Sequence, residues 1–256
     1  VGSEMCIRDR HITELPPLPM PLDNLSATYA DGCLYVAGGK GKPQTVPIGQ
    51  DGSQTAPTNP LFSLQLTPSL QKEWVRLPDF PGPARIQPVL TAQQSEDGIR
   101  LYLAGGFQPA SAHQEAIVCT DMLSYHPKTK QWRNEGFLPS LAGGSHRTVT
   151  GGCAIASGDS SILLVGGVNY DRFRDALNHP EPDYLLHPVD WYKFNTSLLQ
   201  YNTFTKHWTH LGNYEELARA GAGIANNANT VIIIGGELKP GIRTPEVNAF
   251  KLTCHP

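Results

Sequence analysis

The chain has 256 residues, of which 39% are apolar and 17% are charged, and it contains 25 glycines and 22 prolines. This composition is typical of a globular, turn-rich protein rather than a helical or disordered one. The net charge of -3 gives no bulk attraction to nucleic acid, and no apolar run approaches the roughly 20 residues that span a bilayer. We therefore expect no nucleic-acid partner and no insertion into a membrane.

The first ten residues, VGSEMCIRDR, resemble the in-frame translation of a transposon-type sequencing adapter, and Val1 to Asp9 all match it. Segments of this origin are set aside in fold reasoning. We therefore interpret residues 1–10 as an artefact and residues 11–256 as one domain, and we expect natural sequence before His11 to be missing.

The cysteines outside this segment are scattered, with no CxxC pair and no spacing typical of a metal site. The sequence thus predicts buried free thiols rather than a zinc site or a disulfide framework. These cysteines are Cys33, Cys119, Cys153 and Cys254.

A short apolar strand that ends in Gly-Gly occurs four times. The four copies are LYVAGG (34–39), LYLAGG (101–106), ILLVGG (162–167) and VIIIGG (231–236). Another short strand precedes each copy: SATYA, IQPVLTA, GCAIAS and AGAGIA. A further strand and then a tryptophan (Trp74, Trp132, Trp208) follow the first three copies. YHPKTKQW and YNTFTKHW are each typical of two strands joined by a turn.

Four short antiparallel strands with diglycine and tryptophan markers resemble the kelch repeat of β-propellers. The implied fold class is all-β, a kelch-type β-propeller of which this chain holds about four blades. The copies lie farther apart than the usual period of about 50 residues, which indicates inserted loops. HITELPPLP resembles the outer strand of a preceding blade, and VNAFKLTCHP gives a third strand with no fourth after it. We expect the complete ring to be larger.

In such a blade, the loop after the second strand shares a rim with the residues before the first strand. The loops after Gly-Gly carry Lys40, Asn169, Glu237, Lys239 and Arg243, and the segments before the inner strands carry Arg85, His146, Arg147 and Arg219. Arginine matches carboxylate oxygens in bidentate fashion, so this rim suits a small anionic ligand. The structural alternative is that these arginines bond loop carbonyls or a neighbouring carboxylate, and that His146 only supports the fold.

The stretch GGELKPGIRT, residues 235–244, places a carboxylate and two cations directly after a buried strand. Pro240 and Gly241 predict a bend that lets Glu237 and Arg243 face the channel together. The alternative is a surface turn with an ion pair worth at most about 1 kcal/mol. Spacing alone does not decide between the two.

This stretch resembles the G-E-x-K-P-G-x-R-T loop of the bacterial N-acetylneuraminate epimerase (sialic acid mutarotase) family. FPGPARIQ, GSHRT and GGVNYDRF are similar to further parts of that family's layout, and the chain resembles its cyclically permuted branch. The resemblance implies interconversion of the α and β anomers of N-acetylneuraminate, a small anionic sugar, without a cofactor and in the periplasm. It also implies that the complete ring has six blades. Arg147 and Arg219 depart from the smaller or apolar residues of the family.

The resemblance also implies roles for residues. Glu237 would be the catalytic proton acceptor, and Arg243 would hold the substrate carboxylate. Substrate-binding roles fall to Arg85, His146, Asn169 and Lys239.

The insert from residue 168 to 195 is interpreted as a lid over the channel mouth, helical around DRFRDALN. It is rich in Asp, His and aromatic residues, but their spacing fits no standard metal site, so we predict no metal. Tyr184, Trp191 and Tyr192 are interpreted as packing for the lid rather than as a platform for a sugar.

Two other functions use the same scaffold. A non-catalytic kelch domain that binds a protein or a glycan needs no carboxylate opposite arginines. A copper radical oxidase on the same scaffold needs a cysteine placed to cross-link a tyrosine, and none of the cysteines lies on a loop after Gly-Gly. Because one fold supports many functions, the propeller by itself does not choose among them.

Overall fold

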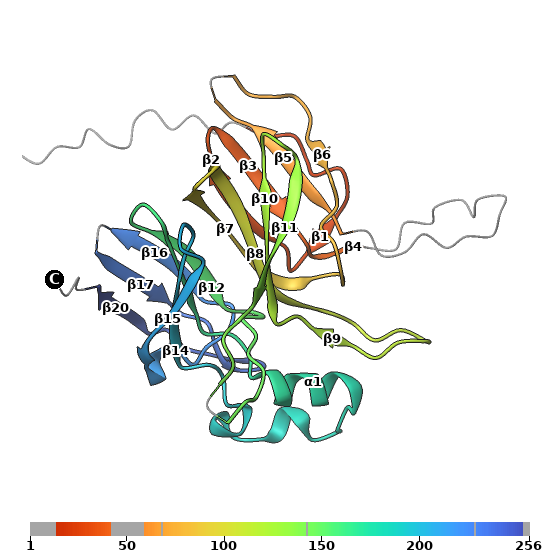
Figure 1. Cartoon of the computed structure of the whole chain (residues 1–256). Helices are drawn as coiled ribbons and strands as arrows, with labels where there is room; N and C mark the ends of the chain where they lie inside the picture. The colour runs from red at the N-terminus through yellow and green to blue at the C-terminus, as the bar shows by residue number, and fades with distance from the viewer. Residues whose placement is uncertain (1–13, 42–58, 68, 142, 228, 253–256) are drawn as a thin grey trace, which may run out of the picture.

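The computed structural model describes residues 14–41, 59–67, 69–141, 143–227 and 229–252 (Figure 1). The adapter-like segment 1–10 and Cys254 lie outside these ranges. The described chain forms four consecutive antiparallel sheets, arranged as blades of a β-propeller, which confirms the predicted fold class. Across the same ranges, none of the helices combines the length and the apolar character needed to cross a membrane.

The strands follow the predicted repeat. The first blade has β2 (Ser26–Ala30), β3 (Cys33–Ala37), β5 (Leu61–Gln65) and β6 (Val75–Leu77). The second has β7 (Ile86–Ser95), β8 (Gly98–Gln108), β10 (Asp121–His126) and β11 (Gln131–Phe137), with β9 (Ile117–Val118) paired to β8. The third has β12 (Cys153–Ser157), β13 (Ser161–Val165), β14 (Ser197–Asn202) and β15 (His207–Asn213). The fourth, over its described residues, has β16 (Gly223–Asn227), β17 (Thr230–Ile234) and β20 (Val247–Lys251).

Short elements connect these strands. Two small pairs join β1 (Leu22–Asp23) to β4 (Lys40–Gly41) and β18 (Glu237–Lys239) to β19 (Ile242–Arg243). The helical elements are α1 (Tyr170–Asn178), η1 (Tyr184–Leu186), η2 (Val189–Tyr192) and η3 (Glu215–Leu217). In Figure 1, α1 lies at the lower edge of the molecule, beyond the strand ends of the second and third blades.

In the first three blades, the diglycine at the end of the second strand lets the next blade approach closely. A Cβ on Gly38 would lie 2.5 Å from the carbonyl oxygen of Arg85, and a Cβ on Gly166 would lie 2.5 Å from that of Arg219. Both glycines have positive φ, at 67° and 66°. The repeated Gly-Gly in the sequence therefore marks the contact between neighbouring blades.

Two of the repeat tryptophans, Trp74 and Trp132, anchor the segment that precedes their blade. The ring of Trp132 lies 5.0 Å from that of Tyr125 and 6.0 Å from that of Phe80. Its indole Nε1 donates to the carbonyl of Pro78 at 2.9 Å. Trp74 Nε1 donates in the same way to the carbonyl of Pro16, at 2.8 Å.

The expected outer strand in HITELPPLP is confirmed only in the contact that its proline makes. Pro16 occupies the position before the first blade that Pro78 occupies after β6, as expected for the end of an outer strand. Residues 14–20, however, form no strand in the part of the chain that is described. At the other end, β20 is the predicted third strand and pairs with β17.

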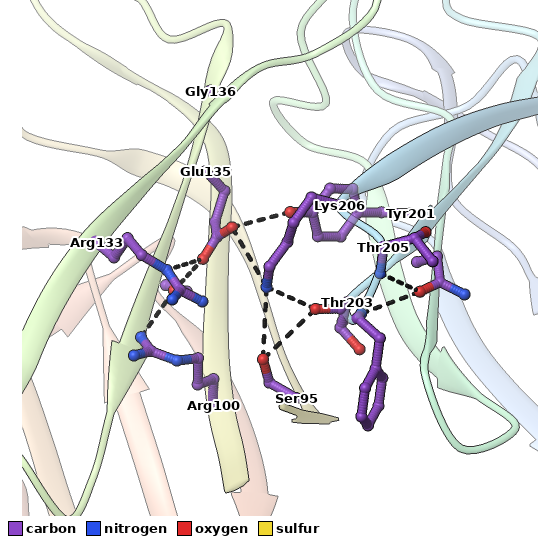
Figure 2. Close-up of polar contacts among 12 residues, drawn as sticks. Ser95, Arg100, Arg133, Glu135, Gly136, Tyr201, Thr203, Thr205 and Lys206 are labelled. Carbon is purple, nitrogen blue, oxygen red and sulfur yellow. Dashed lines mark hydrogen bonds and ion pairs between the residues drawn. The ribbon is translucent and has the colours of Figure 1, made fainter. Parts of the chain in front are cut away.

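A buried polar cluster connects the second and third blades (Figure 2). The side chain of Glu135 on β11 is 4% exposed. It accepts hydrogen bonds from Ser124 Oγ at 2.5 Å, Arg133 Nε at 2.8 Å and the Tyr201 hydroxyl at 2.9 Å. Burial by itself would raise the pKa of Glu135, but these hydrogen bonds outweigh it and the pKa is lowered.

Lys206 completes this cluster from the turn between β14 and β15, with Nζ 3.8 Å from Glu135. Burial lowers the pKa of Lys206, so its charge is disfavoured while that of Glu135 is favoured. Both pKa values are thus lowered: the hydrogen bonds outweigh burial at Glu135, whereas burial outweighs the attraction of Glu135 at Lys206. The cluster therefore fastens the outer strand of one blade to the next.

Candidate active site on the β18–β19 hairpin

Glu237 and Arg243 lie opposite each other on the hairpin formed by β18 and β19. The turn between them contains Gly241, whose φ of 79° suits glycine, and the predicted bend is confirmed. Glu237 and Ala220 exchange backbone hydrogen bonds of 2.7 and 2.9 Å. The carboxylate is therefore carried by a short two-stranded element that is attached to the start of the fourth blade.

The two side chains form an ion pair, with Arg243 Nη2 2.9 Å from Glu237 Oε1. The side chain of Arg243 is 73% exposed, whereas that of Glu237 is 27% exposed. A pair of this exposure adds little to stability. Its guanidinium can therefore exchange one carboxylate for another at small cost, which is the behaviour that a carboxylate-binding group requires.

Lys239, from the same hairpin, contacts the insert. Its Nζ donates to the carbonyl of His187 at 2.6 Å and to that of Leu185 at 3.0 Å. It also lies 5.8 Å from the ring centre of Tyr192. These contacts fix the insert against the hairpin, while the predicted contact of Lys239 with substrate stays a prediction.

Asn169 begins the helix of the insert. Its Oδ1 accepts a hydrogen bond from the backbone N–H of Arg172 at 3.0 Å, as an N-cap residue does. The helix predicted around DRFRDALN is confirmed as α1, which runs from Tyr170 to Asn178. The predicted sugar contact of Asn169 stays a prediction, because its described contact is with the helix.

The aromatic residues of the insert pack against one another. Tyr184 contacts Trp191 and Tyr192 edge to face, with ring centres 5.9 and 5.4 Å apart. Tyr192 is 2% exposed, and its hydroxyl donates to the carbonyl of Tyr184. Their contacts agree with the interpretation of these residues as packing for the insert.

His146 is exposed and its ring lies 5.1 Å from that of Tyr170, at the start of α1. The segment before the third blade is thereby placed beside the insert. The contact of His146 with a sugar stays a prediction.

Arg85 and Arg219 direct their guanidinium groups into the fold. Arg85 donates to Asp121 at 2.8 Å and to the carbonyl of Gly105 at 2.9 Å, and its side chain is 0% exposed. Arg219 donates to Asn248 Oδ1 at 2.8 Å and to the carbonyl of Gly235 at 3.1 Å. These are the contacts of the structural alternative, so the two arginines do not form the expected charged rim. A contact of Arg85 with substrate stays a prediction.

A chain of backbone hydrogen bonds gives the register of the blades. Gln87 N donates to Asn24 O, Gly151 N to Gln87 O, and Gly221 N to Gly151 O, at 2.8, 3.0 and 2.7 Å. All four residues have positive φ. In this register, the residue two positions before each donor is Arg85, Val149 and Arg219.

Val149, and not Arg147, is therefore the third-blade residue that is equivalent to Arg85 and Arg219 in this register. Arg147 is 7% exposed, and burial lowers its pKa. Its Nε and Nη1 atoms have no hydrogen-bond partner within the described ranges.

Asn195 donates to the diglycine carbonyl of the third blade, as an arginine does in the second and fourth blades. Its Nδ2 donates to the carbonyls of Thr148, Val168 and Gly166, at 2.7, 2.9 and 3.2 Å. Gly166 corresponds to Gly105, whose carbonyl is bound by Arg85. The sequence contains no signal for Asn195, because this residue lies at the far end of the insert and an asparagine does not resemble the arginine of the other blades.

The chain is similar to known proteins over most of its length. A model of the N-acetylneuraminate epimerase family, NANM, matches residues 15–255. The N-acetylneuraminate epimerase of Haemophilus influenzae (strain PittEE) is 30% identical over 243 residues, which cover 89% of this chain and 60% of that protein. The N-acetylneuraminate epimerase of Salmonella paratyphi B is 27% identical over 248 residues, which cover 91% of this chain and 57% of that protein.

A solved structure, that of YjhT, has the same fold, with a TM-score of 0.69 and 23% sequence identity. The match covers 93% of this chain and 67% of that one. This chain spans about 57% of the length of curated relatives such as the Salmonella protein. The agreement of the family match with the GGELKPGIRT hairpin and the propeller leads to one conclusion: this chain belongs to the N-acetylneuraminate epimerase family.

Proposed function

We propose that the chain takes part in interconverting the α and β anomers of N-acetylneuraminate, with Glu237 as the proton acceptor. The observation that carries this proposal is the Glu237–Arg243 pair, 2.9 Å apart on an anchored hairpin. Membership of the family and the names of the relatives support it.

The chemistry needs a base and a way to position the sugar. Glu237 takes the proton of the anomeric hydroxyl, and the ring oxygen gains a proton from water as its bond to the anomeric carbon breaks; ring closure reverses both transfers. The open-chain ketone then closes from its other face, which gives the other anomer. Substrate and product are isomers of the same oxidation state, so the protons balance and no electrons are exchanged.

Arg243 binds the carboxylate of the sugar acid. When Arg243 binds the substrate, its ion pair with Glu237 breaks. The carboxylate of Glu237 is then free to accept the proton. A bidentate guanidinium–carboxylate contact fixes the anomeric carbon, because the carboxyl group is attached directly to it. The exposure of Arg243 allows this exchange of partners.

A non-catalytic module that binds a protein or a glycan is the second candidate. Leu186 of the insert is 81% exposed and Leu185 is 60% exposed, close to the carbonyls that Lys239 contacts. An apolar surface beside the hairpin suits binding without turnover.

One assay separates the two functions. Freshly released α-N-acetylneuraminate is added to the purified chain, and its relaxation to the β anomer is followed by proton NMR. The chain should be measured by itself and within the longest reading frame that contains it, with buffer alone and glucose mutarotation as controls. Sugar binding with relaxation no faster than buffer in both forms would favour the binding module.

A further inference from the structure

We propose that Glu181, Asp183 and His187, in the insert, form a binding site for a divalent metal ion of the zinc type. One carboxylate oxygen from each acidic residue and one ring nitrogen of His187 all lie within 4.8 Å of one another. This differs from the prediction made from the sequence, in which the spacing of these residues matched no standard metal site.

His187 supplies evidence that is independent of the two acidic residues. The side chain of His187 is 24% exposed, but its Nε2 atom is buried and has no hydrogen-bond partner among the residues that the structure describes. The atom faces Glu181, with Oε2 3.8 Å away, which is too long for a hydrogen bond. A buried ring nitrogen without a partner is costly, and a metal ion bound to it would remove that cost.

The ring of His187 is also held in one orientation. It stacks on Trp191 with ring centres 3.9 Å apart and planes 7° apart. The guanidinium of Arg172 lies 4.5 Å from the centre of the same indole ring. This stacking restricts the plane of the His187 ring, in which Nε2 lies on the side of Glu181.

The backbone brings the three residues together. The Tyr184 N–H donates to the carbonyl of Glu181 at 3.2 Å, and the Leu186 N–H donates to that of Asp183 at 2.7 Å. These bonds form the short helical turn η1, and Lys239 fixes its far end through the carbonyls of Leu185 and His187. The turn is thus folded by bonds that do not involve the proposed metal.

The donor set selects the class of ion. One imidazole and two carboxylates suit zinc and similar first-row divalent ions, whereas magnesium and calcium prefer oxygen donors alone. Zinc bonds of about 2.0–2.2 Å require the three donors to draw closer together. Glu181 can do so because its side chain is 57% exposed. Three protein donors leave a fourth position for water or another ligand.

Metal binding should be measured directly on the purified full chain after dialysis against a chelator. Zn²⁺ is titrated by calorimetry into the wild type, His187→Gln and the double variant Glu181→Gln/Asp183→Asn. His179→Gln is the matched control, because His179 lies in the same insert and contacts Asp175 at 3.1 Å, but is 74% exposed. Circular dichroism checks that each variant is folded.

We expect one site per chain whose dissociation constant rises about tenfold or more in both test variants and is unchanged in the control. The absorption of bound Co²⁺ should show nitrogen and oxygen ligands without a thiolate charge-transfer band. Three results would overturn the proposal. These are no binding at one equivalent, an equal loss in His179→Gln, and a thiolate band, which would assign the ion to a cysteine. The double variant keeps the test valid if His187→Gln does not fold, because the carboxylate side chains are on exposed residues.

Discussion

The Nη2 atom of Arg243 lies 2.9 Å from Oε1 of Glu237, across the two strands of the β18–β19 hairpin. The arginine is mostly exposed, and the carboxylate is mostly covered. The pair is therefore weak as a stabilising contact but well placed to open when another anion arrives. Both the predicted catalytic role and the alternative of a simple surface turn contain this contact, so variants must distinguish them.

Replacing Gly166 with alanine should destabilise the chain more than the same change at Gly158. Both glycines have positive φ, so both variants bear left-handed strain of about 1–2 kcal/mol. A Cβ on Gly166 would in addition overlap the carbonyl oxygen of Arg219 at 2.5 Å, whereas a Cβ on Gly158 meets nothing within 4 Å. Urea denaturation measures the difference, and equal losses would show that the diglycine does not set the contact between blades.

Arg85→Met should weaken the fold rather than sugar binding. The change leaves the carboxylate of Asp121 and the carbonyl of Gly105 without their donor, and breaking a buried pair in this way costs about 3–5 kcal/mol. Thermal unfolding of Arg85→Met, Asp121→Asn and the double variant measures the coupling of the pair. A variant with unchanged stability that no longer binds N-acetylneuraminate would instead support the substrate-binding role.

Glu135→Gln should lower the free energy of unfolding by about 1.5–3 kcal/mol at neutral pH, because three donors lose a charged acceptor. The lowered pKa of Glu135 means that its ionisation stabilises the fold above the unfolded value of about 4.3. This stabilisation is lost as the pH falls through the folded pKa. The difference between wild type and variant should therefore shrink below pH 4.

Asp97 adds an effect of the same sign. Its hydrogen bond from Arg100 lowers the pKa of Asp97 to about 2, so the Glu135 variant should still lose stability in acid, but less steeply than the wild type. Unfolding curves from pH 7 to pH 2 test this, with the exposed Glu73→Gln as the control. Identical acid profiles for all three proteins would contradict the role of the cluster in Figure 2.

Lys239→Met should loosen the insert without unfolding the propeller. The ammonium group donates to the carbonyls of Leu185 and His187, and each such charged hydrogen bond is worth about 1.5–3 kcal/mol. Hydrogen exchange of the amides in residues 184–192 should accelerate about tenfold or more, while β13 and β14 stay protected. The matched control is Lys251→Met on the exposed face of β20. Unchanged exchange in Lys239→Met would show that the hairpin does not hold the insert.

Much of the fold could be predicted from the sequence because it rests on local signals. The diglycines are needed where Gly38 and Gly166 meet the next blade, and Trp132 and Trp208 mark the outer strands. The bend at Pro240 and Gly241 also follows from local chemistry, and it is what places Glu237 opposite Arg243.

The roles of the other charged residues could not be predicted, because they depend on contacts between distant segments. Arg85 binds Asp121 and the carbonyl of Gly105. In the third blade, Asn195 binds the equivalent carbonyl, that of Gly166. The grouping of Glu181, Asp183 and His187 arises only once the turn η1 has formed. Spacing along the chain contains none of this information.

The central claim is that Glu237 accepts the proton that opens the sugar ring. It is tested most directly by proton NMR of the α-to-β relaxation of N-acetylneuraminate, with wild type, Glu237→Gln and the control Glu216→Gln, whose residue is exposed. We predict that wild type and control accelerate relaxation equally and that Glu237→Gln, with an unchanged circular dichroism spectrum, loses the acceleration by about 100-fold or more. Full acceleration by a folded Glu237→Gln variant would contradict the claim.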